Sequence, residues 1–186
     1  MDHTTCIETY IQAKDCNRAH LMPRAFAADA RLNMEVKTDA IAFPAEMRGV
    51  DAIAETLASA FGKRYENVYT FCIGAAPSQG MRAGKRYECD WLVCMSEKDS
   101  GLARVGYGRY IWTFESEQRG PVTGLTIVIE EMAVLPPETR AAVLQWASAL
   151  PYPWCPVQHL EQAPPALDAV ARVVAALQQS AMRTAR

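Results

Sequence analysis

Hydrophobic and polar positions along the chain repeat with two periods, one typical of helices and one typical of strands. Apolar side chains recur every three to four residues over residues 5–14 and 50–61, which predicts an amphipathic helix in each segment. A shorter helix over residues 18–28, interrupted by Pro23, is predicted between them.

The strand period appears first at residues 31–37, where apolar and polar side chains alternate as in a half-buried strand. Four later segments are rich in aromatic and β-branched residues and are predicted to be strands. Short turns divide the last three, so these are expected to form an antiparallel meander. The four segments are residues 68–74, 85–97, 103–117 and 124–135. Helices followed by a run of strands favour an α+β fold with helices on one face of a curved sheet.

The pattern changes after Leu135, where two prolines close the strand region. Helices are predicted over residues 137–150 and 165–185, separated by the stiff aromatic segment PYPWCP. We therefore divide the chain into an α+β domain, residues 1–135, and a helical, proline-containing extension, residues 136–186. Because the extension is rich in apolar residues, we expect it to pack against the body or against a second subunit.

Composition narrows the range of functions. Half of the 186 residues are hydrophobic and the formal net charge is −2, with both signs interspersed, so neither nucleic acid nor a membrane surface is expected as a partner. The first twenty residues lack a secretion signal, and no segment has the length to cross a bilayer, which favours a soluble, cytoplasmic protein. The six cysteines include no CxxC pair, and no nucleotide-binding or nucleophile motif occurs. No metal site and no cofactor are predicted.

The segment IETYIQAKDCNRAHLMPRAFAADARL, followed by MRGVDAIAETLASAF and the long strands, resembles the nuclear transport factor 2-like superfamily. This superfamily includes SnoaL-like polyketide cyclases, ketosteroid isomerases, scytalone dehydratases and limonene epoxide hydrolases. The resemblance covers roughly residues 5–135. It implies a cone-shaped α+β barrel, in which a strongly bent sheet wraps around helices and leaves a pocket at its wide end. Members range from acid–base enzymes to proteins without chemistry, so fold does not decide function.

Among the enzymes of this superfamily, ketosteroid isomerases are the nearest template for a site. They use an aspartate on a strand as general base and an oxyanion hole that contains a tyrosine. The match implies that Tyr10 takes the tyrosine's place, whereas the place of the base is taken by Met34, which cannot accept a proton. Counting back from Phe114 gives Tyr107 as a second hydrogen-bond donor.

A base must then come from elsewhere, and Glu130 and Glu131 stand in an otherwise apolar strand. In the superfamily's register, Glu131 shares a face with Ile129, so we interpret Glu131 as the inward, catalytic carboxylate. A carboxylate there would have a raised pKa. An ion pair between Glu131 and Arg109 is an equally good interpretation, and Arg109 could instead bind a carboxylate-bearing ligand.

Pocket walls follow from the side on which each strand side chain is predicted to point. We expect Leu32, Met34 and Val36 to line the pocket from the first strand, together with Trp91, Arg109 and Ile129. Tyr152 and Trp154 of PYPWCP are expected to cap its mouth. Superfamily members commonly form dimers through the outer face of the sheet, so a homodimer through outward Tyr110 and Trp112 is expected.

Two hypotheses for function remain open. The first is a cofactor-independent, SnoaL-like isomerase or cyclase that acts on a small hydrophobic or carbonyl-bearing molecule, with Tyr10, Tyr107 and Glu131 as catalytic residues. The second is a binding or dimeric interaction module that holds a small ligand without transforming it. The position of the carboxylate distinguishes them, because a base must lie within hydrogen-bonding distance of the ligand or of a phenol.

Overall fold

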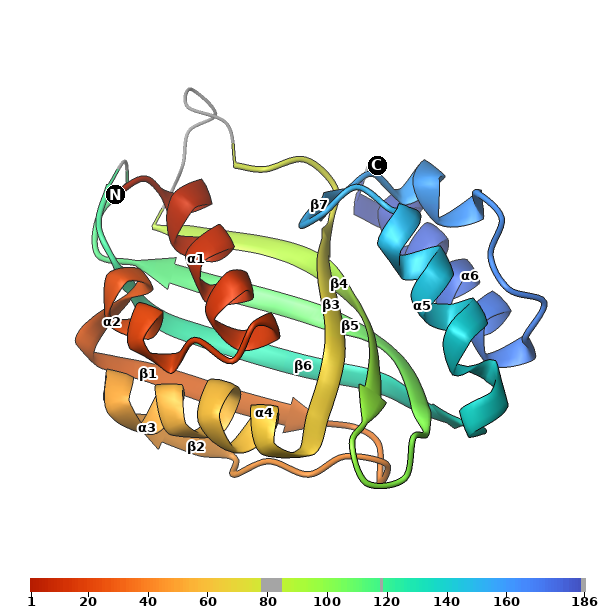
Figure 1. Ribbon diagram of the computed structural model, residues 1–186. Coiled ribbons are helices and arrows are strands. Elements are labelled where there is room, and N and C mark those ends of the chain that lie inside the picture. The colour runs from red at the N-terminus through yellow and green to blue at the C-terminus, as the bar shows by residue number, and fades with distance from the viewer. Residues whose placement is uncertain (78–84, 118, 185–186) are drawn as a thin grey trace.

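In the described part of the chain, a strongly bent sheet of seven strands forms the frame of the molecule (Figure 1). The computed structural model describes residues 1–77, 85–117 and 119–184. The strands lie in the order β2-β1-β6-β5-β4-β3-β7, and neighbours are antiparallel except for the parallel pairs β1–β6 and β3–β7. Their bounds are β1 (Phe26–Val36), β2 (Glu46–Arg48), β3 (Tyr65–Ile73), β4 (Arg86–Glu97), β5 (Ala103–Phe114), β6 (Val122–Leu135) and β7 (Trp154–Cys155).

The N-terminal helices cover the concave face of this sheet (Figure 1). They are α1 (His3–Asp15), η1 (Ala19–Leu21), α2 (Met22–Ala25), and a continuous helix made of α3 (Val50–Ala54), the π-helical η2 (Glu55–Ala60) and α4 (Phe61–Arg64). The α+β fold, a bent sheet wrapped around helices, is confirmed. Among the residues that the structure describes, the sheet stays open, with β2 and β7 at its edges, and does not close into a barrel.

The second predicted helix, residues 18–28, is wrong in its C-terminal part. Its helical residues end at Ala25, and β1 begins at Phe26, five residues earlier than the alternating pattern indicated. The reason is a tertiary contact, because Phe26 pairs with Val122 of β6. The predicted helix over residues 50–61 is present and runs on to Arg64.

The C-terminal segment packs on the opposite, convex face of the sheet (Figure 1). It contains η3 (Pro137–Thr139), α5 (Arg140–Ala149), η4 (Val157–Glu161) and α6 (Asp168–Thr184). A second apolar cluster joins it to β3, β4 and β5 through Phe71, Leu92, Val105, Trp146, Val170 and Leu177. The last residue of the predicted final helix, Ala185, lies outside the described residues. Within the described ranges, no helix is long and apolar enough to cross a membrane.

A β-bulge in β6 reverses the alternation of its side chains. Tyr107 of β5 pairs with Glu131, but its neighbour Gly108 pairs with Ile129, so Glu130 has no partner opposite it. Beyond this extra residue, Met132 points to the concave side in place of Glu131. The strands also approach so closely here that a Cβ on Gly108 would collide with the carbonyl oxygen of Val128.

Candidate functional site: a pocket under the concave face

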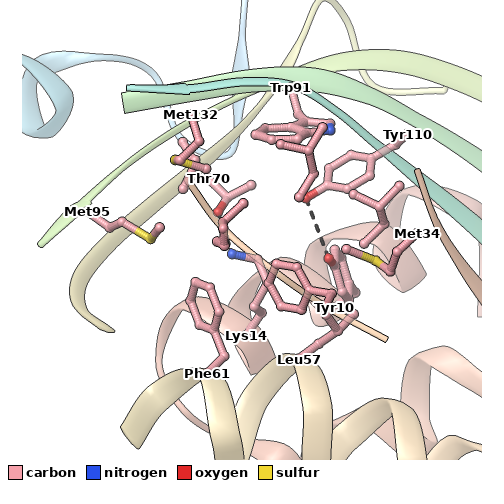
Figure 2. Close-up of a pocket in the computed structure, with 15 residues that line it drawn as sticks. Tyr10, Lys14, Met34, Leu57, Phe61, Thr70, Trp91, Met95, Tyr110 and Met132 are labelled. Atoms are coloured by element: carbon pink, nitrogen blue, oxygen red, sulfur yellow. Dashed lines mark hydrogen bonds between the residues drawn. The ribbon is translucent and has the colours of Figure 1, made fainter. Parts of the chain in front are cut away.

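A mainly apolar pocket lies between the concave face of the sheet and helices α1 and η2–α4 (Figure 2). Its cavity volume is about 50 Å³, enough for a few water molecules. Four of the fifteen lining residues carry a hydroxyl or ammonium group: Tyr10, Lys14, Thr70 and Tyr110. The remaining wall is aliphatic, aromatic or thioether, and three flexible methionines allow it to adapt to a guest.

Lys14 brings a positive charge into this apolar setting. It is the penultimate residue of α1, and only 7% of it is exposed. Its Nζ donates to Asp15 Oδ1 at 2.7 Å and to Thr70 Oγ1 at 2.7 Å, and lies 4.8 Å from the centre of the Phe61 ring. Burying an ammonium is costly unless it is paired and hydrogen-bonded, and here it is both.

Asp15, the charge partner, accepts hydrogen bonds from four donors. Its side chain is only 2% exposed. Besides Lys14, the Thr70 hydroxyl donates at 2.8 Å, the Thr70 backbone N–H at 2.7 Å and the Tyr152 hydroxyl at 3.0 Å. All four donors are within normal hydrogen-bond length. The carboxylate is therefore fully occupied and is not presented to the pocket as a base.

Two phenols face each other in the pocket wall. The hydroxyls of Tyr10, from α1, and Tyr110, from β5, are 3.5 Å apart (Figure 2). Burial raises the pKa of both phenols well above their ordinary value of 10.0, so both stay protonated at neutral pH. Since one hydroxyl donates to the other, one proton of the pair is left for a ligand.

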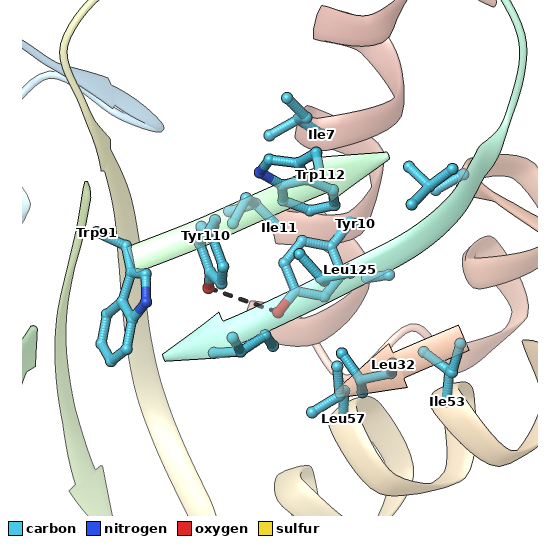
Figure 3. Close-up of a cluster of buried hydrophobic side chains, with 14 of the residues drawn as sticks. Ile7, Tyr10, Ile11, Leu32, Ile53, Leu57, Trp91, Tyr110, Trp112 and Leu125 are labelled. Carbon is cyan, nitrogen blue, oxygen red and sulfur yellow. Dashed lines mark hydrogen bonds between the residues drawn. The ribbon is translucent and has the colours of Figure 1, made fainter. Parts of the chain in front are cut away.

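The indole of Trp91 adds a further donor. Its Nε1 is buried and has no hydrogen-bond partner in the described part of the chain. Figure 3 shows this nitrogen on the side of the ring that faces the Tyr10 and Tyr110 hydroxyls. A buried N–H without an acceptor costs about 1–3 kcal/mol, so an acceptor from a ligand would offset that cost.

Four of the predicted site residues lie in the pocket wall: Tyr10, Met34, Trp91 and Ile129. Leu32 and Val36 belong to the same apolar cluster but not to the pocket lining. Tyr152 and Trp154 do not cap the mouth of this pocket. Their side chains instead donate to Asp15 and Glu8 of α1.

Three predicted site residues lie on the convex side of the sheet, so their placement in the pocket was wrong: Glu131, Tyr107 and Arg109. Glu131 faces α6 and lies 3.4 Å from an Arg172 nitrogen, because the bulge at Glu130 moves it off the face of Ile129. Its neighbour Glu130 pairs with Lys37 on the outside. Neither glutamate lines the pocket.

Tyr107 is on the convex side because Phe114, from which it was counted, is buried on the concave side, and Arg109 shares the face of Tyr107. Seven residues back along a strand changes the face, so the inward tyrosine is Tyr110. Arg109 pairs with Asp90 at 3.2 Å, and neither residue lines the pocket. The placement of Tyr110 and Trp112 on an outer, dimer-forming face was wrong for the same reason, since both are buried against Tyr10.

Sequence reasoning missed Lys14, Asp15, Thr70 and Tyr110 as site residues. A signal for Lys14 was present, because it falls at helical spacing with Ile7, Tyr10 and Ile11 on the apolar face of α1. A lysine on such a face needs a buried partner, and Asp15 follows it directly. No local signal marks Thr70, which meets Asp15 only through the packing of α1 on β3.

Comparisons with known proteins agree on the fold. No protein-family model matches the sequence, and no curated protein matches it. Among solved structures, a nuclear transport factor 2-like superfamily protein from Salmonella enterica serovar Typhimurium is similar with a TM-score of 0.50 and 17% identity, over 67% of this chain and 85% of that chain. The chain has the nuclear transport factor 2-like fold.

Two further structures support this. A nuclear transport factor 2-like protein from Burkholderia thailandensis has a TM-score of 0.53 and 11% identity, over 69% of this chain and 91% of that chain. A hexachlorocyclohexane dehydrochlorinase, LinA type 2, has a TM-score of 0.55 and 8% identity, over 70% of this chain and 84% of that chain. At such identities the likeness extends to the fold and not to activity.

Proposed function

We propose that the pocket binds a small, mainly apolar, uncharged molecule through one acceptor oxygen, such as that of a ketone. The observation that carries this proposal is the balance of hydrogen-bonding groups around the cavity. Lys14 uses two of its three ammonium hydrogens on Asp15 and Thr70, the Tyr10–Tyr110 pair keeps one proton, and Trp91 keeps its N–H. The site thus has unused hydrogen-bond donors, and a ligand with an acceptor atom would complement them.

Charge supports an uncharged ligand. Lys14 and Asp15 form a buried pair with no net charge, so an anionic ligand would leave one uncompensated negative charge in an apolar cavity. Desolvation of such a charge costs several kcal/mol. A neutral carbonyl oxygen accepts the same hydrogen bonds without that cost.

An isomerase or cyclase is the second candidate, and the convergence of two protonated phenols favours it, because such a pair stabilises a developing oxyanion. The glutamate base of this hypothesis is dropped, since Glu131 pairs with Arg172. Among the fifteen lining residues there is no carboxylate, and Met34 stands where the isomerase comparison implied a base. Binding without chemistry is therefore our first proposal.

A titration with two matched probes tests the binding proposal. Cyclopentanone and methylenecyclopentane have nearly the same shape but differ in the acceptor oxygen, and both are titrated into the protein while amide and indole NMR shifts are followed. We expect the ketone to shift the Trp91 indole N–H signal, because it supplies the missing acceptor. The replacement Ile41→Trp should fill the cavity and abolish the signal shifts that either probe causes. Val134→Trp, at a position that is 43% exposed, should leave those shifts unchanged.

The same ketone in heavy water tests the enzyme candidate. Exchange of its α-hydrogens for deuterium, accelerated by the protein and lost in Tyr10→Phe, would support proton-transfer chemistry. Binding without accelerated exchange would support a binding module. A protein that binds neither probe would contradict the proposed function.

Homodimerisation stays a prediction, but its predicted surface changes. Tyr110 and Trp112 are in the core, and the convex face over β3, β4 and β5 is covered by α5 and α6 of the same chain. A dimer would therefore use a different surface, and a mass measurement in solution tests whether it forms.

A further inference from the structure

The C-terminal segment reaches the pocket's polar end through one hydrogen bond. Tyr152 belongs to the PYPWCP stretch, which follows α5 and contains the strand β7, and its hydroxyl donates to Asp15 Oδ2 at 3.0 Å. Asp15 in turn accepts the Lys14 ammonium at 2.7 Å. Tyr152, which is 137 positions from Asp15 in the sequence, is thus two hydrogen bonds from the Lys14 ammonium in the pocket.

The Lys14 ammonium depends on Asp15 for its position. A lysine side chain has four rotatable carbon–carbon bonds, and without a fixed acceptor the ammonium would favour water over an apolar cavity. Asp15 itself is the last residue of α1, where the negative end of the helix dipole opposes a carboxylate. Donors must therefore hold Asp15, and apart from Lys14 they are the two donors of Thr70 and the Tyr152 hydroxyl.

Tyr152 is held firmly from its own side. The backbone of its segment pairs with β3, where Cys72 N–H donates to the Pro153 carbonyl at 2.7 Å and Gly74 N–H donates to the Cys155 carbonyl at 2.9 Å. The Tyr152 ring meets the Phe71 ring edge to face, with centroids 5.8 Å apart. The hydroxyl therefore points at Asp15 although 45% of the residue is exposed to solvent.

A second side chain of the same segment bonds α1 without touching the pocket network. The Trp154 indole N–H donates to Glu8 Oε1 at 2.8 Å. Glu8 lies on α1 but does not line the pocket, and in the described part of the chain it forms no hydrogen bond or ion pair with Lys14 or Asp15. Trp154 thus docks the segment on α1 as Tyr152 does, and it offers a matched control.

We infer that Tyr152 is a positioning residue that sets the pocket's preference for ligands with an acceptor oxygen, by fixing Asp15 and through it the Lys14 ammonium. This inference rests on the proposed function, since it needs a ligand that accepts a hydrogen bond from Lys14. It assigns the C-terminal segment a part in ligand selection besides its packing on the convex face.

The test compares Tyr152→Phe with Trp154→Phe in the full-length chain. Each replacement keeps an aromatic ring and removes one side-chain hydrogen bond between the segment and α1. For each protein, dissociation constants of cyclopentanone and methylenecyclopentane are measured by NMR titration, and their ratio is compared with that of the unmodified protein. The ratio cancels any general loosening of the pocket, which would weaken both probes alike.

We expect Tyr152→Phe to reduce the preference for the ketone about fivefold, which corresponds to about 1 kcal/mol, the net value of one typical hydrogen bond, and to leave the hydrocarbon's affinity unchanged. Trp154→Phe should keep the original ratio. An unchanged ratio in Tyr152→Phe, or an equal loss in both variants, would overturn the inference. Failure of the unmodified protein to bind either probe would overturn the proposed function, a result distinct from both.

Discussion

Replacing Asp15 by asparagine is the sharpest perturbation of the polar network beneath the pocket. The amide keeps the shape of the carboxylate but removes its charge, and its NH₂ group points a donor at groups that already donate. Four donors surround Asp15 within 3.0 Å, and its side chain is only 2% exposed. Removing one partner of a buried ion pair costs about 3–5 kcal/mol. We therefore expect Asp15→Asn to lower the free energy of unfolding by about 4 kcal/mol, a large part of a typical domain's stability.

Replacement of Lys14, the other partner of the ion pair, is expected to lower the free energy of unfolding less than replacement of Asp15. Lys14→Met leaves Asp15 with three donors, from Thr70 and Tyr152, so we expect it to cost only about 2 kcal/mol. The double variant removes both charges and should cost less than the sum of the two single changes, which is the signature of a direct interaction.

Urea unfolding, followed by tryptophan fluorescence, measures these free energies, and the slope of the transition shows whether each variant still unfolds in one step. An Asp15→Asn protein within about 1 kcal/mol of the unmodified chain would refute the argument that a buried, fully bonded carboxylate holds this region together. Additive single changes would likewise contradict the direct pairing of Lys14 with Asp15.

Three further predictions concern other parts of the fold. Gly108→Ala should destabilise the protein by about 3 kcal/mol in the same assay, because its Cβ would collide with the Val128 carbonyl, whereas Gly124→Ala, whose nearest contact is an ordinary 3.5 Å, should be near neutral. A hydrogen bond from Ser100, aided by Arg104, lowers the pKa of Glu97 below its ordinary value of 4.5. The ionised Glu97 therefore contributes fully to stability above pH 4.5, and this contribution is lost as the pH falls through the lowered pKa. Glu97→Gln should make the free energy of unfolding less dependent on pH in this range. Burial raises the pKa of Tyr10 above 10.0, so the folded protein should form phenolate at higher pH than the unfolded chain and lose stability as the pH rises beyond 10.0; a near-ultraviolet absorbance titration checks this, with Tyr10→Phe removing one late-titrating group.

Local pattern predicted the elements well, because period and turn chemistry are encoded in neighbouring residues. Residues 50–61 repeat every three to four positions and form a helix, and residues 124–135 form the strand β6. The face on which each side chain lies was less secure. It follows from parity, and a single extra residue, Glu130, reverses the parity for Glu131 and Met132. A bulge depends on the pairing of two strands, so the residues of β6 alone do not reveal it.

The polar part of the site was the least predictable, because its members come from three separate places in the chain. Lys14 and Asp15 end α1, Thr70 lies within β3, and Tyr152 follows α5. Each of these residues has an ordinary local explanation, such as a solvated lysine or a surface tyrosine. Only the packing of α1 against β3, with β7 added at the sheet edge, makes them one network.

The C-terminal segment connects the two faces of the sheet. Its helices α5 and α6 bury the apolar convex face, while PYPWCP pairs with β3 as the edge strand β7 and bonds α1 on the concave side (Figure 1). A change that loosens α5 or α6 would therefore also loosen the Asp15 carboxylate, since Tyr152 follows α5 after only two residues. Because Asp15 holds the Lys14 ammonium, stability at the convex face and selectivity in the pocket should vary together in variants of this segment. Ligand preference and the free energy of unfolding should thus be correlated among variants at the C-terminal end of α5, next to Tyr152. They should be independent among variants at the exposed Met182, near the C-terminal end of α6.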